Sequence, residues 1–213
     1  MFGLEEVLAA ELLKLGARDI VKLTRAVAFT GDTGFMFKAN LCLRTALRIL
    51  LPINTFAVSN EQSLYEEIKK MEWENFLDVS GTLAVDTSLN TDLFNHSQFI
   101  SQKVKDAVVD RFREKFGERP SVDFNQPSLR INIHVFKNHC TVSLDSSGES
   151  LHKRGYRDQT NLAPINEVLA AGMVLLSGWN KLTHLVDPMC GSGTIGIEAA
   201  LLAANIPPGY FRK

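Results

Sequence analysis

The chain has 213 residues, of which 45% are hydrophobic and 22% are charged. This composition is ordinary for a soluble globular protein and is enough for one large or two small domains with a buried core. The net charge of -1 excludes a chain that is attracted to polyanions as a whole. Any nucleic-acid surface must therefore come from local segregation of charge.

Targeting and metal-binding patterns are absent from the sequence. No apolar run has the length of a transmembrane helix, and the first residues do not form a secretory signal pattern. The three cysteines lie far apart without C-x-x-C spacing, and the five histidines show no i, i+4 pairing. These features argue against a disulfide framework or a zinc site. We expect a cytoplasmic protein that binds no membrane and no metal.

The first fifty residues predict a helix, two strands, a second helix and a third strand. Leu4, Leu8, Leu12 and Leu15 follow helical spacing, and Gly16 is a suitable C-terminal stop. The predicted strands cover residues 20–23 and 26–30, a turn follows at 31–34, the second helix ends near residue 43, and an extended run spans 49–53.

The middle of the chain predicts an α/β module. A helix around Leu64 and Ile68 precedes a strand at 82–86, and strands at 129–136 and 141–144 are joined by a tight link. A long helix over 98–115 places four apolar residues on one face: Ile100, Val104, Val108 and Phe112.

The last part begins near Ser146 and combines a basic cluster at 152–157 with two apolar helices. The helical stripe of the first of these helices is predicted to pack in the core, with Pro164 in its first turn. Its residues are Ile165, Leu169, Met173 and Leu176. A strand at 182–186 then leads through a glycine-rich loop into a helix at 195–202.

The glycine-rich loop is the strongest functional signal. Asp187 ends the predicted strand, and Gly191 and Gly193 let the backbone pass close to a ligand at the N-terminus of the next helix. The pattern also matches G-x-G-x-x-G, the dinucleotide fingerprint, but its confirming acidic residue would fall beyond Lys213. A dinucleotide-dependent oxidoreductase and a purely structural loop therefore stay open as alternatives.

The sequence Asp-Pro-Met-Cys-Gly-Ser-Gly-Thr over 187–194 resembles the first motif of class I S-adenosylmethionine-dependent methyltransferases that methylate exocyclic amines of nucleic-acid bases. Residues 147–157 and 162–173 resemble the entry into the methyltransferase domain of THUMP-containing RNA methyltransferases. The likeness is greatest to the bacterial enzymes that methylate guanine in large-subunit ribosomal RNA, and it covers almost the whole chain.

This resemblance implies an α/β chain of three parts. Residues 1–56 are expected to form a ferredoxin-like domain that lacks its usual first strand, which makes the N-terminus look truncated or mis-started. Residues 57–145 are expected to form a THUMP RNA-binding domain, and 146–213 the beginning of a Rossmann-like methyltransferase domain. The implied S-adenosylmethionine-binding residues are Pro164, Asp187, Pro188, Cys190, Gly191, Gly193 and Thr194. Of these, Cys190 is expected to pack beneath the loop, since no base is available to make it a nucleophile.

RNA contacts are expected from two basic segments. Between Ser97 and Lys137 the basic residues exceed the acidic ones by three, and Tyr156 lies among the basic residues of 152–157. Lysine and arginine neutralise phosphates, whereas aromatic rings stack on bases. Ordinary helix-surface pairing and a solvated linker are the alternative interpretations. The candidate residues are Lys103, Lys105, Arg111, Arg113, Arg130, Lys153, Arg154 and Arg157. The implied partner is 23S ribosomal RNA.

No catalytic residue is predicted in this chain. The family places a ribose-binding acidic residue after its second strand and an Asn-Pro-Pro-Tyr type motif after its fourth strand. The tetrapeptide at 207–210 lacks the preceding Asn or Asp. We therefore expect the 213 residues alone to be inactive, and a non-catalytic RNA-binding module with a vestigial loop is the alternative.

Overall fold

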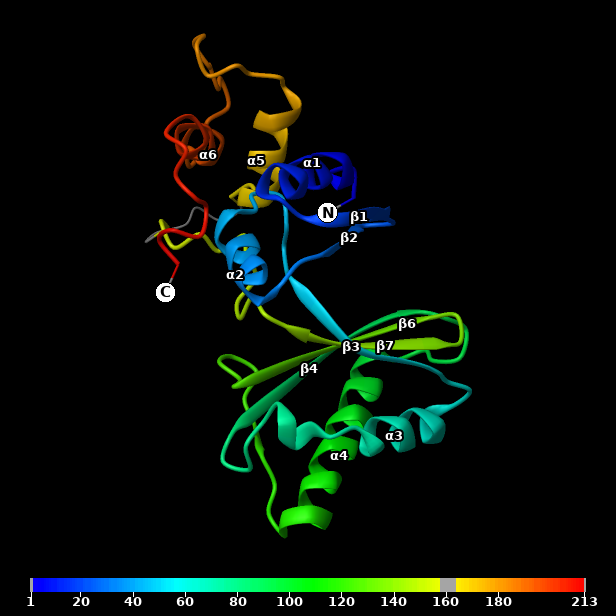
Figure 1. Cartoon of the computed structure of the whole chain (residues 1–213). Coiled ribbons are helices and arrows are strands. Elements are labelled where there is room, and N and C mark those ends of the chain that lie inside the picture. The colour runs from blue at the N-terminus through cyan, green and yellow to red at the C-terminus, as the bar shows by residue number, and fades with distance from the viewer. Residues whose placement is uncertain (1, 158–163, 213) are drawn as a thin grey trace. The chain divides into compact units, whose positions relative to one another are not determined.

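The computed structural model describes residues 2–157 and 164–212. These residues form two compact units, one made of Met1–Ile49 with Glu149–Lys213 and the other of Leu50–Gly148 (Figure 1). Leu162 and Ala163, which open one of the family-like stretches, lie outside the described residues. No described helix has the length and apolar character that a bilayer crossing requires.

The first unit begins with the predicted order of elements. These are α1 (Glu5–Leu15), β1 (Arg18–Leu23), β2 (Ala26–Thr30) and α2 (Thr33–Cys42). Gly16 ends α1 in the left-handed conformation with φ 101°, as its position predicts. Asp32 caps α2 by accepting a hydrogen bond from the Phe35 amide at 2.7 Å. The two strands pair antiparallel, and both helices contribute to a small apolar core that also contains Leu151.

The strand predicted at 49–53 forms, but it does not join β1 and β2. It is β3 (Leu50–Ala57), and it pairs antiparallel with β7 (His139–Asp145) in the sheet of the second unit. The ladder runs from Leu50 opposite Asp145 to Ala57 opposite His139. A local sequence pattern determines neither the partner nor the register of a strand. The pairing of β3 with β7 could therefore not be predicted from the sequence.

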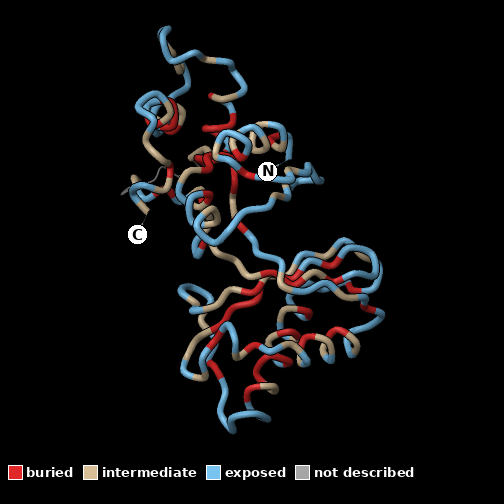
Figure 2. The backbone as a smooth tube through the Cα atoms, viewed as in Figure 1, coloured by how far each residue is buried: buried red, intermediate tan, exposed pale blue. Residues whose placement is uncertain are grey.

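The second unit is a five-stranded sheet in the order β3-β7-β6-β4-β5, with α3 (Glu61–Lys70) and α4 (Ser97–Phe116) packed on one face (Figure 1). The remaining strands are β4 (Thr82–Asn90), β5 (Ser121–Val122) and β6 (Leu129–Phe136), and a short 3-10 helix spans Trp73–Asn75. The predicted stripe of α4 is confirmed, because Ile100, Val104, Val108 and Phe112 are all buried in the core between the helices and the sheet (Figure 2).

The first unit is completed by α5 (Glu167–Leu176) and α6 (Thr194–Ala203), which pack against each other. The core face predicted for α5 is wrong: Leu169, Met173 and Leu176 are 37%, 45% and 61% exposed. The opposite face is buried because its small residues allow a close approach to the N-terminal helix region. A Cβ on Gly172 would lie 2.7 Å from the Leu4 side chain.

The start of α5 also differs from the prediction. Pro164 is not in the first turn, because Asn166 is the N-cap and its side chain accepts hydrogen bonds from the amides of Val168 and Leu169. Asn and Asp are strong N-caps, so Asn166 sets the helix boundary two residues after the proline.

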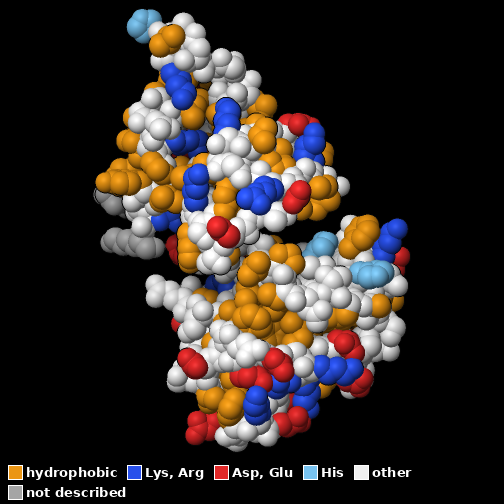
Figure 3. Space-filling model, viewed as in Figure 1, with side chains coloured by type: hydrophobic (Ala, Val, Ile, Leu, Met, Phe, Trp, Pro, Cys, Tyr) orange, Lys and Arg blue, Asp and Glu red, His pale blue; other side chains and the backbone are white. Residues whose placement is uncertain are grey.

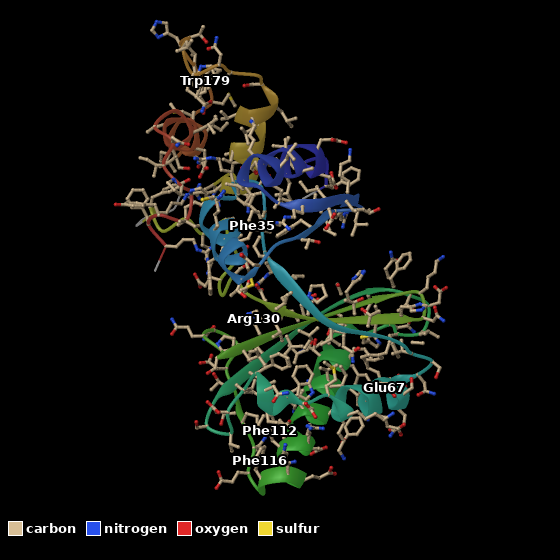
Figure 4. The ribbon with its side chains drawn as sticks, in the orientation of Figure 1. Phe35, Glu67, Phe112, Phe116, Arg130 and Trp179 are labelled. Atoms are coloured by element: carbon tan, nitrogen blue, oxygen red, sulfur yellow. The ribbon has the colours of Figure 1, made fainter. Side chains whose placement is uncertain are left out.

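The strand predicted at 182–186 does not form. Asn180 instead accepts hydrogen bonds from the Leu182 and Thr183 amides, and the Trp179 indole donates to the Thr183 carbonyl (Figure 4 labels Trp179). A strand needs a neighbour for its backbone groups, and no described residue pairs with this segment. Leu182 and Val186 are accordingly 90% and 82% exposed.

Candidate cofactor loop and RNA contacts

The glycine loop lies between the exposed segment 182–186 and α6. The Asp187 carboxylate accepts a hydrogen bond from the Met189 amide at 3.0 Å, and the Gly193 amide donates to the Cys190 carbonyl at 2.7 Å. Gly191 and Gly193 have φ of +51° and +75°, a left-handed conformation that glycine adopts without strain. A Cβ on Gly193 would meet no protein atom within 4 Å, so the space beside the loop is open.

The loop has unsatisfied polar groups of both signs. Oδ2 of Asp187 is buried and has no hydrogen-bond partner among the described residues. Gly193 is the N-cap of α6 and carries no side chain that could accept from the amides of the first turn. A free carboxylate oxygen and a set of free amides suit a ligand with an ammonium and a carboxylate group, such as the methionine end of S-adenosylmethionine. The residues therefore fit this cofactor.

The surroundings of the loop differ partly from expectation. Cys190 is exposed, so the prediction that it packs beneath the loop is wrong. Pro188 lies with Asp187 at the edge of an open cavity of ≈540 Å³ that also involves Met173 and Trp179. The exposure of Met173 thus places a flexible apolar side chain beside the loop, where the sequence pattern had placed it in the core.

Arg157, predicted to contact RNA, is directed at the protein. Its guanidinium donates to the Thr194 hydroxyl at 2.5 Å and to the Ile165 carbonyl at 3.1 Å. Its Nε lies 3.1 Å from a carboxylate oxygen of Glu167, and the Arg157 side chain is 17% exposed. This arginine therefore connects the entry to α5 with the first residue of α6.

Arg154 lies in the interior, which does not agree with its predicted role at an RNA surface. It is 2% exposed and donates to the carbonyls of Leu151 at 2.7 Å and Arg44 at 2.5 Å. Its Nε is 3.5 Å from the carboxylate of Glu198, which also accepts a hydrogen bond from the Tyr156 hydroxyl at 3.1 Å. Composition alone identifies the basic cluster but cannot show that a member of it is buried.

Burial dominates the electrostatics around Glu198. It raises the pKa of the Glu198 carboxyl and of the Tyr156 hydroxyl, and it lowers the pKa of the Arg44 guanidinium. Arg44 donates to the carbonyl of Ile206, just past the end of α6, at 2.6 Å. These buried polar side chains thus connect α6 to the segment that follows α2. Their burial costs desolvation free energy, which is offset only by the ion pairs and hydrogen bonds that they form with one another.

On α4, Arg111 is a structural cation. It forms two hydrogen bonds to the Glu74 carboxylate, at 2.8 and 2.6 Å, and its guanidinium also donates to the Lys70 carbonyl at 3.1 Å. The hydrogen bonds from Arg111, and after them that from Lys115, hold the pKa of Glu74 well below its usual range. A bidentate, partly buried pair of this kind is not readily exchanged for a phosphate.

The other predicted cations on α4 form ion pairs or ring contacts at the surface. Arg113 pairs with Asp110 at 3.1 Å and is 53% exposed. Lys105 pairs with its neighbour Asp106 at 2.6 Å, and the Lys103 ammonium lies 5.3 Å from the centre of the Tyr65 ring. Exposed pairs contribute little to stability, so their cations can turn to another anion at small cost.

Arg130 (labelled in Figure 4) lies on β6 and pairs with Asp86 at 3.2 Å, and it also donates to the Phe124 carbonyl at 2.8 Å. Lys153, in the first unit, is 56% exposed and pairs with Glu149 at 2.8 Å. Acidic and basic side chains are interspersed over the region of α3 and α4 (Figure 3). Local segregation of positive charge is therefore weaker on this face than the residue count predicts.

Across the described ranges, no group of three or more histidine, cysteine or acidic side chains is arranged to hold a metal ion. The residues that sequence reasoning missed are Glu74, Glu167 and Glu198, the acceptors that engage three of the predicted cations. They lie 10 to 44 positions away from their partners, and no short motif signals such pairs.

Three family models match the chain in succession. They are an RlmL ferredoxin-like domain over residues 1–50, a THUMP domain over 58–145 and an RMKL-like methyltransferase domain over 154–213. The three matched ranges follow one another along the chain in the order that the resemblance implies. The resemblance drawn from the loop at 187–194 is thereby confirmed, as is the α/β fold class with ferredoxin-like, THUMP and Rossmann-like parts.

Individual proteins support the same relationship. Proteins named ribosomal RNA large subunit methyltransferase K/L from Syntrophotalea carbinolica and Magnetococcus marinus are 45% and 46% identical to 99% of this chain. The crystal structure of SMU.472, a methyltransferase candidate complexed with SAH, has a TM-score of 0.84 and 35% identity over 100% of the chain. The chain spans 30% of the length of the two named relatives and 56% of the crystallised chain.

Proposed function

We propose that the chain forms the RNA-binding and cofactor-loop portion of a ribosomal RNA (guanine-N2-)-methyltransferase that acts on 23S RNA in the cytoplasm. The observation that carries the proposal is the unpartnered Asp187 oxygen beside the glycine loop at the start of α6. The THUMP match over residues 58–145 and the names of the relatives support RNA as the substrate class.

The residues of the chain would divide the work as follows. When bound, S-adenosylmethionine supplies an electrophilic methyl group on its sulfonium sulfur. Asp187 would accept hydrogen bonds from the ammonium group of the cofactor. The first amides of α6 would donate hydrogen bonds to the carboxylate of the cofactor. Gly191 and Gly193 would keep the backbone close to the ligand. The chain thereby contributes orientation, which is a large part of catalysis when two reactants must be aligned.

The cations that would contact RNA are those that no buried protein acceptor engages. Arg113 and Lys153, both in surface pairs, are the leading contacts, with Lys103, Lys105 and Arg130 as partly exposed additions. Arg111, Arg154 and Arg157 are left out because each is engaged by partly or fully buried protein acceptors.

Binding to a ribosomal RNA stem-loop should weaken steeply as salt rises. Replacing Arg113 and Lys153 by alanine should reduce the slope of log affinity against log salt by roughly 0.7 to 0.9 for each lost phosphate contact. Filter binding over a series of salt concentrations measures this slope. Lys70→Ala is the matched control, because Lys70 is 69% exposed and forms a comparable surface pair with Glu67. An unchanged slope in the double variant would remove these two residues from the RNA surface.

Residues 1–213 alone should transfer no methyl group to ribosomal RNA, because they contain neither the ribose-binding acidic residue nor an Asn-Pro-Pro-Tyr type motif. Incubation with radiolabelled S-adenosylmethionine and 23S RNA tests this expectation. Incorporation above background would show that the chain contains a catalytic group that the motif comparison misses. RNA binding with no cofactor binding would favour the alternative of a non-catalytic RNA-binding module.

A further inference from the structure

We propose that Arg157 is a positioning residue for the cofactor loop, which holds the first residue of α6 in place through the Thr194 hydroxyl. The inference rests on the proposed function of the loop. It replaces the expected contact between Arg157 and RNA by a contact that sets the geometry of the cofactor site.

The guanidinium of Arg157 reaches the starts of two helices at once. Glu167 is the first residue of α5 and Thr194 the first residue of α6, and they are 5% and 1% exposed. Arg157 pairs with Glu167 at 3.1 Å and donates to the Thr194 hydroxyl at 2.5 Å. That hydroxyl lies 3.1 Å from the Ser192 hydroxyl inside the glycine loop. A continuous polar chain thus runs from α5 through Arg157 into the loop.

The neighbouring residues hold the same face of α6 one turn later. Glu198 follows Thr194 by four positions, so both side chains lie on one face of the helix. Arg154 and Tyr156 engage Glu198, whereas Arg157 engages Thr194. The segment 154–157 therefore fixes α6 at two successive turns, and only the Arg157 contact lies at the loop.

A charged arginine is suited to this task. The planar guanidinium donates in several fixed directions, so one side chain can bridge a carboxylate, a hydroxyl and a carbonyl. Its position also determines where the free amides at the start of α6 point. Loss of the contact to Thr194 should let the loop sample orientations that cannot bind the methionine end of the cofactor, whereas loss of the whole arginine side chain also leaves the buried Glu167 without its cation.

Amide hydrogen exchange measured by NMR on the 213-residue chain tests the bridge without any cofactor. Two amides report on the loop: Gly193, which donates to Cys190, and Ile197, which donates to Gly193. In Arg157→Ala both should exchange about ten-fold faster, which is the loss expected for one hydrogen bond to a charged group. The amide of Ala204, which donates to Ala200 at the far end of α6, should keep its rate.

Thr194→Val is the second variant, because it keeps the side-chain volume and the Arg157–Glu167 pair but removes the hydroxyl. It should reproduce the faster exchange at Gly193 and Ile197, and Thr194→Ser should restore the wild-type rates. The effects of Arg157→Ala and Thr194→Val should not add in the double variant, since both remove the same contact. Arg18→Ala, at an exposed arginine on β1, is the matched control and should change neither rate.

Calorimetry with S-adenosylmethionine, on the chain extended to the full length of its relatives, provides the second readout. Arg157→Ala and Thr194→Val should each weaken binding by about ten-fold, while Thr194→Ser binds as the wild type does. Equal acceleration at Ala204, additive effects in the double variant, or unchanged rates at Gly193 and Ile197 would overturn the proposal. If the extended wild-type chain does not bind S-adenosylmethionine, the proposed function fails, and the exchange rates measured on the 213-residue chain still decide the role of Arg157.

Discussion

Replacing Arg154 by alanine should lower the free energy of unfolding of the unit formed by residues 1–49 and 149–213 by about 3–5 kcal/mol. The variant leaves the Glu198 carboxylate buried without its cation and removes the donor to the carbonyls of Leu151 and Arg44. A buried charge that loses its partner keeps its full desolvation cost. Native-state hydrogen exchange, which reports on the two units separately, measures the loss.

The effect should depend on pH through Glu198. Burial raises the pKa of this carboxyl in the folded protein, so the neutral form is the one that the fold favours. The contribution of Glu198 to the stability of the fold is therefore fully present below the pKa that this carboxyl has in the unfolded chain. It is lost as pH rises through the higher pKa that the carboxyl has in the folded protein. Arg154 opposes this loss, because its charge lowers the pKa of Glu198. The stability of Arg154→Ala should consequently fall more steeply with rising pH than that of the wild type.

Two further variants separate charge from volume. Adding Glu198→Gln to Arg154→Ala should recover part of the lost stability, because the uncompensated charge disappears while an acceptor for the Tyr156 hydroxyl remains. Lys153→Ala, at the exposed neighbour, should cost less than about 1 kcal/mol because surface pairs contribute little. If Arg154→Ala is as mild as Lys153→Ala, then Arg154 is not buried in a structural pair.

Periodicity predicted the long helix α4 well because its apolar residues occupy one face and its charges the other. Ile100, Val104, Val108 and Phe112 are buried together, and Gly117 ends the helix in the left-handed conformation. The strand at 129–136 was likewise predicted with its observed bounds, since its apolar residues alternate with polar ones. In such segments, local pattern and tertiary packing give the same answer.

The face of α5 could not be predicted in the same way. Apolar residues of α5 lie on all sides of the helix, so the spacing of the large ones does not identify the side that packs in the core. Packing buried Ala170, Ala171 and Gly172, of which Gly172 permits a close approach to Leu4, and left Leu169 and Met173 exposed. The distance between two packed helices depends on the side chains of both, so the sequence of one helix alone does not determine which of its faces is buried.

The backbone geometry of the loop could be predicted from the sequence, whereas the partners of the charged side chains around it could not. Asp187, Gly191 and Gly193 stand in a contiguous motif whose backbone demands are local. The environments of Arg154 and Arg157 depend on Glu198 and Glu167, which lie on α6 and α5. The sequence does not show how far these helices lie from the two arginines. Counting cations therefore could not show that Arg154 and Arg157 contact α6.

In the chain extended to the full length of its relatives, Gly193→Val should abolish S-adenosylmethionine binding measured by calorimetry. Gly193 has φ +75°, which a β-branched residue adopts only with strain, so the loop would shift. A Cβ at this position meets no protein atom within 4 Å and would instead project into the open space beside the loop. Asp187→Ala should weaken binding as well, because it removes the unpartnered Oδ2 acceptor.

The strain in Gly193→Val is confined to the loop, so circular dichroism and RNA binding should stay near the wild type. Gly196→Ala is the matched control. Gly196 lies within α6, a Cβ there meets no atom within 4 Å, and alanine is favoured over glycine in a helix by roughly 1 kcal/mol. Normal S-adenosylmethionine binding by Gly193→Val would contradict the assignment of the loop. Binding of NAD in place of S-adenosylmethionine by the wild type would instead favour the dinucleotide interpretation of the same glycines, because both cofactors require close backbone approach at this turn.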